Sequence, residues 1–142
     1  MKAISLWQPW ATLIAIGEKQ YETRSWVIKY RGLLAIHASK RMDEVQEGYC
    51  LQEPFKTVLE AKGYTFQNLP LGAIIAVVRI VDIQSTVGVV KTISKQEKAF
   101  GNYMEGRYAW KLELVKALVK PIPMAGAQGL FEVADDLIMR FM

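Results

Sequence analysis

The sequence predicts an α+β domain with a curled, mostly antiparallel sheet or small open barrel and helices at its ends. Runs rich in β-branched residues are spread along the chain, and helices of uneven length separate them. Regular strand–helix–strand alternation is absent, which disfavours a doubly wound sheet. The 142 residues are 51% hydrophobic and contain no repeat or linker-like stretch, so we expect one domain over residues 1–142.

The first third of the chain reads as strand, helix, strand, strand. Residues 2–6 form a short apolar strand, and Pro9 then suits the first turn of a helix that ends at Gly17. Residues 19–26 favour extended structure, and residues 33–38 form an apolar run short enough to be a buried strand.

The middle of the chain is predicted to be helical before a long strand. We expect helices over residues 42–51 and 53–63, followed by the strongest strand of the chain at residues 73–83. Residues 94–100 are expected to form a short helix, because Ser94 and the residue three positions later fit a capping box.

The C-terminal part is predicted to hold two more strands. Residues 108–115 mostly alternate apolar and polar side chains, as a half-exposed strand does, and Pro121 and Pro123 are expected to break the chain. A short strand at 129–133 follows, and Asp135-Asp136 is expected to cap a last helical turn.

The positive charge is concentrated near the N-terminus. Residues 1–41 hold seven Lys or Arg against two acids, a balance of +5, whereas the rest of the chain has a balance of −1. Such asymmetry is typical of a surface that faces a polyanion, although a plain solvated face gives the same count.

Several familiar chemistries are excluded. The chain has no glycine-rich phosphate loop and no Gly-x-Ser-x-Gly elbow, and a single histidine and a single cysteine, Cys50, cannot build a zinc site. We therefore expect no metal and no cofactor. One cysteine permits no internal disulfide, and Arg79 and Asp82 interrupt the most apolar segment. These features favour a cytoplasmic protein without a membrane partner.

The most informative segment is Gly17–Arg24, with the pattern Gly-x-Lys-x-x-Glu-x-Arg. In a straight strand Glu22 and Arg24 share a face, where they would form an ordinary surface ion pair, and Lys19 points away. All three converge on one ligand only if Lys19 lies on a bend after the helix or a bulge rotates the strand; Gly17 makes such a bend feasible.

Aromatic and basic residues are interleaved around this segment. Tryptophans are more often core residues in a domain of this size, and His37 fits a packed, hydrogen-bonded position. Flat rings beside cations are also what a splayed base and its phosphate require. The candidate ligand-binding residues are Gln8, Trp10, Lys19, Glu22, Arg24, Ser25, Trp26, His37, Lys40 and Arg41.

These segments, taken together, resemble the ASCH domain (activating signal cointegrator homology) of the PUA-like superfamily. The similarity covers nearly the whole chain and is carried by the Gly17–Arg24 pattern with residues 4–11, 31–32, 35–38, 71–76, 108–110 and 129–133. It implies a small PUA-like β-barrel with flanking helices, a cleft lined by the Gly17–Arg24 segment, and binding of RNA or another nucleic acid.

The resemblance also implies an enzymatic alternative. Some members are small amidohydrolases acting on acylated cytidine, and others have been linked to RNA cleavage. In the amidohydrolases the motif lysine, here Lys19, acts with a threonine three residues later and with a distant glutamate, for which Glu97 is the counterpart. Glu22 occupies the threonine position, which argues against that activity.

Three functions therefore remain open. A binding module for RNA, single-stranded nucleic acid or a nucleoside-like molecule comes first. A hydrolase acting on a modified nucleoside or on RNA, with Lys19, Glu22 and Glu97 as catalytic residues, comes second. A protein-interaction adaptor is the third.

Overall fold

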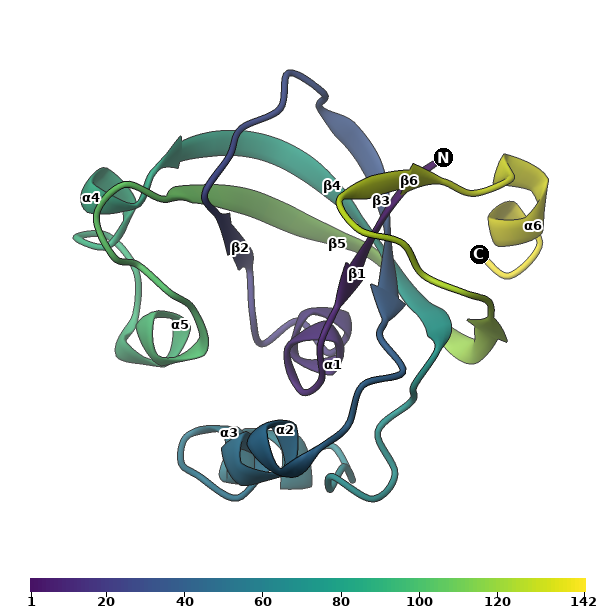
Figure 1. The fold of residues 1–142 in the computed structure, drawn as a ribbon, viewed down its shortest axis with the longest axis horizontal. Coiled ribbons are helices and arrows are strands. Elements are labelled where there is room, and N and C mark those ends of the chain that lie inside the picture. The colour runs from purple at the N-terminus through teal and green to yellow at the C-terminus, as the bar shows by residue number, and fades with distance from the viewer.

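The computed structural model describes residues 1–142, and its six strands form one curled mixed sheet in the order β2-β5-β4-β3-β1-β6 (Figure 1). The strands are β1 (Lys2–Leu6), β2 (Tyr21–Arg24), β3 (Gly32–Ala38), β4 (Ala73–Ser85), β5 (Tyr108–Pro123) and β6 (Leu130–Glu132). The sheet curls as a half-barrel whose edge strands, β2 and β6, do not pair with each other. The predicted α+β class is confirmed.

One strand pair is parallel and the others are antiparallel. The parallel pair is β1 with β3, and its register sets Ser5 beside His37. The C-terminal strand β6 lies on the other side of β1, so the two ends of the chain meet at one edge of the sheet.

Helix α1 (Trp10–Ala15) lies in the hollow of the curled sheet, against β3, β4 and β5 (Figure 1). Every residue of α1 except Trp10 is buried. Ile14 packs with Ile36, Val78 and Trp110 in the main core cluster. Burial of apolar surface on this scale is the main favourable term in folding, so α1 is fixed by the sheet rather than by its own helix propensity.

The remaining helices cover the ends and edges of the sheet (Figure 1). They are α2 (Glu44–Cys50), α3 (Phe55–Glu60), α4 (Thr86–Val89), α5 (Lys95–Phe100) and α6 (Asp135–Met139). Phe55 of α3 and Phe100 of α5 meet at a ring-centroid distance of 4.9 Å, in a second cluster that includes Leu13 of α1. None of the helices has the length and apolar character that crossing a membrane requires.

The expected break at the C-terminal prolines is wrong, because β5 continues through both of them to Pro123. Pro121 lies where the register between β4 and β5 shifts, next to Ile74, and Pro123 is the last paired residue. On its other edge, β5 pairs with β2 only as far as Lys111. No ladder hydrogen bond therefore needs the missing N–H of Pro121, and the strand tolerates it.

The N-terminus of α5 differs from the predicted capping box in one respect. The Ser94 side chain accepts from the Glu97 amide at 3.1 Å, as expected. The Glu97 carboxylate does not accept from the backbone N–H of Ser94, as a capping box requires. It accepts instead from the backbone N–H of Gln20 at 2.7 Å. This contact joins α5 to the segment between α1 and β2. Helix α4 had no signal in the sequence pattern, and Asp135 and Asp136 lie in the first turn of α6, after its cap.

We expect the Trp110→Ala substitution to destabilise the fold strongly. Trp110 on β5 is 0% exposed and its ring packs edge-to-face on Trp26 at 4.9 Å. Removing so large a buried ring lowers the free energy of unfolding by about 3–5 kcal/mol. Urea denaturation measures the change. The control Val119→Ala lies on the same strand at 95% exposure, and its effect should stay within about 0.5 kcal/mol.

Candidate functional site

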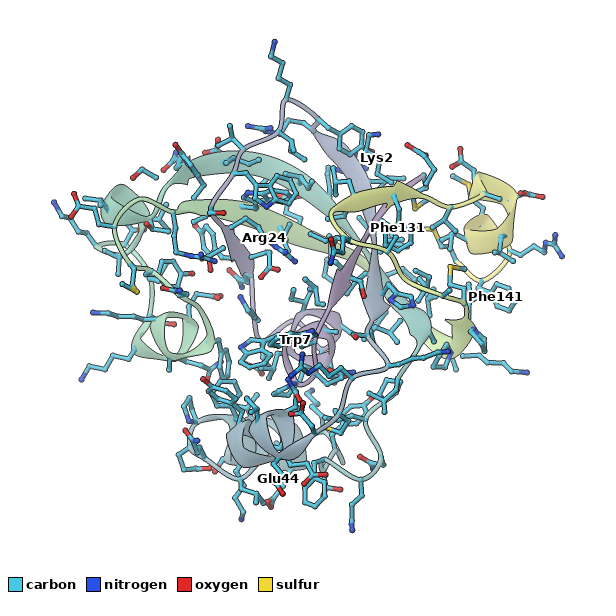
Figure 2. All side chains as sticks on the ribbon, in the orientation of Figure 1. Lys2, Trp7, Arg24, Glu44, Phe131 and Phe141 are labelled. Carbon is cyan, nitrogen blue, oxygen red and sulfur yellow. The ribbon has the colours of Figure 1, made fainter.

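Two cavities that share three lining residues form one groove, and residues of β1 and β2 contribute to its lining. The motif lobe has a volume of about 430 Å³ and is lined mainly by Trp10, Lys19, Glu22, Thr23, Phe100 and Arg107. The loop lobe has a volume of about 670 Å³ and is lined mainly by His37, Ser39, Lys40 and residues 125–129. Ser5, Trp7 and Arg24 line both lobes, and Figure 2 shows Arg24 beside β2 and Trp7 near α1.

The turn after α1 brings Lys19 to the same cavity as Glu22 and Arg24. Gly17 has φ of +80°, a conformation that glycine adopts without strain. The amides of Glu18 and Lys19 both donate to the Leu13 carbonyl at 3.0 Å, so the chain folds back on the helix end before β2 begins. Lys19 therefore lies on a bend before β2. The alternation of side chains along a strand, which would point Lys19 away from Glu22 and Arg24, does not apply to it.

Lys19 is nearly enclosed. Its side chain is 3% exposed, and Nζ donates to the Tyr21 carbonyl. Burial lowers the pKa of Lys19 below its ordinary value, and the negative charges of Glu22 and Glu97 oppose that shift. A lysine whose pKa is lowered in this way loses its proton at a lower pH than a solvated lysine does.

Glu97 lies behind Lys19 and lines a neighbouring cavity with Glu18 and Gln20, outside both lobes. Burial raises its pKa, and the hydrogen bond from the Gln20 amide opposes that rise. Its Oε2 has no hydrogen-bond partner, and neither has the buried hydroxyl of Tyr103, whose pKa burial also raises. Several buried groups beside the motif lobe thus favour their neutral forms.

Glu22 and Arg24 form the ion pair expected of neighbours on one strand face. Arg24 Nε and Nη2 lie 3.1 Å and 3.0 Å from the same Glu22 oxygen, Oε2. The Nη1 group of Arg24 makes no hydrogen bond within the chain, and Arg24 lines both lobes. The pair can therefore hold its shape and still present one guanidinium edge to a ligand.

Two tryptophans stand on the walls of the groove. Trp7 is 47% exposed and lines both lobes, and the Arg41 guanidinium lies over its ring at 4.6 Å. Trp10 lines the motif lobe and packs edge-on against Tyr49 at 4.8 Å. Aromatic faces at such positions suit a flat, apolar ligand surface.

The His37 side chain connects β1 to the segment that follows β5 and lines the loop lobe. Its Nε2 lies 2.8 Å from the Met124 carbonyl and its Nδ1 lies 2.9 Å from Ser5 Oγ. A carbonyl only accepts, so in the neutral ring Nε2 carries the proton and the Ser5 hydroxyl donates to Nδ1. The His37 ring is buried, as the sequence suggested, and it also forms part of the cavity wall.

The other sequence-predicted residues are dispersed. Gln8 is fully buried and uses its side chain inside the protein, accepting from the Thr12 amide at 2.9 Å and donating to the Pro70 carbonyl at 2.8 Å. Trp26 packs on the core, and Ser25 is exposed outside both lobes. The structure groups Lys19, Glu22, Arg24 and Trp10 in the motif lobe and His37 and Lys40 in the loop lobe, with Arg41 behind Trp7.

Several lining residues were missed by sequence reasoning. Arg107 reaches the motif lobe from the segment before β5 and donates to the Thr23 carbonyl at 2.9 Å. Ser5 and residues 125–129 lie in the loop lobe. The glycine-rich stretch from Ala125 to Gly129 offered a weak signal, since such runs permit close backbone approach; Arg107 offered none.

Comparison with known proteins identifies the relatives of this chain. The family model described as ASCH domain matches residues 4–122. Activating signal cointegrator 1 of Homo sapiens is 36% identical over 83 residues, which are 58% of this chain and 14% of that protein, and the Mus musculus protein gives the same values. The chain thus matches only a small part of these curated relatives.

Solved structures share the fold. The crystal structure of ASCH from Zymomonas mobilis superposes with a TM-score of 0.59 at 15% identity, over 98% of this chain and 91% of that one. A variant of the same protein gives 0.58 at 16% identity, over 98% and 92%. At these identities the likeness shows the fold alone.

The lowered pKa of Lys19 predicts a pH-dependent stability. Between its lowered pKa and the ordinary value of 10.5, the unfolded chain binds a proton that the folded chain has released. The free energy of unfolding therefore rises with pH in that window. Lys19→Met has no titrating amine at this position, so wild type should gain stability relative to Lys19→Met as the pH rises toward 10.5. Urea titrations of both proteins measure this, and a difference that stays constant contradicts the burial of a titrating amine.

Proposed function

The chain belongs to the ASCH domain family, and from that premise we propose that it binds RNA or a nucleotide-like ligand in the groove of the two lobes. The observation that carries the proposal is the convergence of Lys19, Glu22 and Arg24 with two tryptophans on one groove. A cavity of about 430 Å³ lies within the range of small-molecule sites.

The charges of the groove favour an anionic ligand. Arg24 and Arg107 are the cations of the motif lobe beside the buried Lys19, with Glu22 as its one carboxylate, and Lys40 adds a further cation in the loop lobe. Phosphate contacts made by such cations dominate the affinity of nucleic-acid binding and make it sensitive to salt. Part of the positive excess of the first 41 residues therefore lies in the groove, because Arg24, Lys40 and Lys19 all come from that part of the chain.

The motif lobe also offers what a base requires. The rings of Trp7 and Trp10 provide apolar surface, and stacking on aromatic rings is tolerant of base identity. Arg24 engages only Oε2 of Glu22, so Oε1 is free to accept from a base amino group while the ion pair stays intact. Single-stranded RNA, whose bases can leave the stack, fits this arrangement better than a duplex.

The Arg24→Gln substitution tests the proposal. It removes the cation shared by the two lobes, and the loss of one charge-assisted hydrogen bond weakens binding by about tenfold. Fluorescence anisotropy with a labelled single-stranded RNA at low salt measures the dissociation constant. Arg79→Gln is the matched control, because Arg79 is exposed on β4 and lines neither lobe, and its effect should be about twofold or less.

Absence of any RNA or single-stranded DNA binding by the wild-type protein at low salt would sink the proposal. Equal losses in Arg24→Gln and Arg79→Gln would place the binding surface elsewhere.

A second candidate function is hydrolysis of an acylated nucleoside. It is favoured by the burial that lowers the pKa of Lys19 and raises that of Glu97. A neutral Lys19 amine is able to take a proton from water as the water attacks the acyl carbon, and the proton then passes to the departing amine nitrogen. Glu22 holds no hydroxyl and Thr23 Oγ1 accepts from the Asn102 amide at 3.3 Å, so water rather than a side chain is the nucleophile in this scheme.

Incubation with N4-acetylcytidine, followed by chromatography for released cytidine, tests this candidate. If Lys19 is the base, Lys19→Met should lower the rate by at least about a hundredfold. Lys62→Gln changes the net charge equally at an exposed site and should leave the rate unchanged. Turnover that survives Lys19→Met excludes the scheme.

A further inference from the structure

We propose that the loop lobe is a phosphate-binding subsite, so that the groove takes a nucleotide with its base in the motif lobe and a neighbouring phosphate in the loop lobe. The inference rests on the proposed function and names the chemistry of one part of that site. It is carried by three features of the loop lobe: its charge, its backbone donors and the contacts that hold them.

The two lobes differ in charge and in apolar surface. The motif lobe includes the Glu22 carboxylate and the rings of Trp10 and Phe100. The loop lobe is lined by the cations Arg24 and Lys40 and by no carboxylate, and its apolar lining is limited to Trp7 and two alanines. An anionic group such as a phosphate is therefore favoured in the loop lobe, and a flat group with an amino substituent is favoured in the motif lobe.

Backbone donors add to the cations. The amides of residues 125–128 donate to no group of the chain, whereas the amide of Met124, directly before them, donates to the Gly72 carbonyl at 3.0 Å. The Ser39 hydroxyl accepts from the Arg41 amide at 3.2 Å and keeps its own proton for donation. Successive free amides beside cations are a common means of holding phosphate oxygens.

The donors are held in place by close packing. The Met124 carbonyl is fixed by His37 at 2.8 Å, directly before the free amides begin. Gly126 lies so close to the β1–β3 pair that a Cβ there would be 2.7 Å from His37 Cε1 and 2.9 Å from Ser5 Oγ. Only glycine allows this approach.

The two cations are positioned as well. The stem of Lys40 packs on Gly72, where a Cβ would lie 3.0 Å from Lys40 Cγ. Arg24 stands where the lobes join, with Nη1 free and the rest of its guanidinium bound to Glu22. The free edge of Arg24 is therefore placed to contact the phosphate next to a base held in the motif lobe.

The experiment compares three probes by titration into the ¹⁵N-labelled protein: adenosine, adenosine 5′-monophosphate and the dinucleoside monophosphate ApA. The phosphate-bearing probes should bind at least about tenfold more tightly than adenosine. They should also shift the amide signals of residues 125–128, which adenosine should leave nearly unchanged. Tighter binding of the monophosphate indicates a terminal phosphate, and tighter binding of ApA indicates an internal phosphodiester.

Lys40→Gln should remove most of the preference for the phosphate-bearing probes over adenosine. Lys62→Gln, an equal change of charge at an exposed lysine outside both lobes, should keep the preference. Gly126→Ala should abolish the shifts at residues 125–128, because its Cβ displaces the segment from His37.

A preference for phosphate that is equal in wild type and Lys40→Gln overturns the inference, as do unshifted amides at residues 125–128. The inference can fail while the proposed function holds: RNA binding that depends on Arg24 but not on Lys40 would leave the motif lobe as the site and remove the phosphate from the loop lobe.

Discussion

The groove depends on the burial of α1 in the hollow of the curled sheet. Trp7 precedes this helix and Lys19 follows it, so both walls of the motif lobe are attached to its two ends. The helix has no hydroxyl or carboxylate cap, and the buried Gln8 side chain instead accepts from the Thr12 amide. Gln8 thus supports the site without lining it, because a helix end buried without such a partner leaves an unsatisfied amide.

The same burial accounts for the electrostatics around the motif segment. The Gly17 turn returns the chain against the helix end and encloses the Lys19 amine, while α5 brings the Glu97 carboxylate to the Gln20 amide. Desolvation moves the pKa values of both groups toward neutrality, and the unpartnered Glu97 Oε2 and Tyr103 hydroxyl lie nearby. Groups kept at such a cost in stability are characteristic of functional sites.

The parallel register of β1 and β3 organises the other half of the groove. It sets Ser5 beside His37, and their hydrogen bonds tie the strand ends to the segment after β5. Gly126 lies directly on both side chains, and residues 125–129 line the cavity together with Arg24 and Lys40. A polar, cationic lobe and an aromatic lobe are thereby joined at Arg24, which is the combination that a base with its phosphate requires.

The sequence by itself determined the α+β class and most element positions, and it predicted a candidate site at the Gly17–Arg24 segment, since hydrophobic period, glycine stops and charge order are local properties. It predicted the wrong end for β5, because whether Pro121 costs a hydrogen bond depends on which edge of the strand is paired. Only the tertiary structure decided that Lys19 joins Glu22 and Arg24, that Gln8 and Trp26 are internal, and that Arg107 and the amides of residues 125–128 reach the groove. The placements of Arg107 and of residues 125–128 arise from contacts between residues 84 and 87 positions apart, which a local pattern cannot encode.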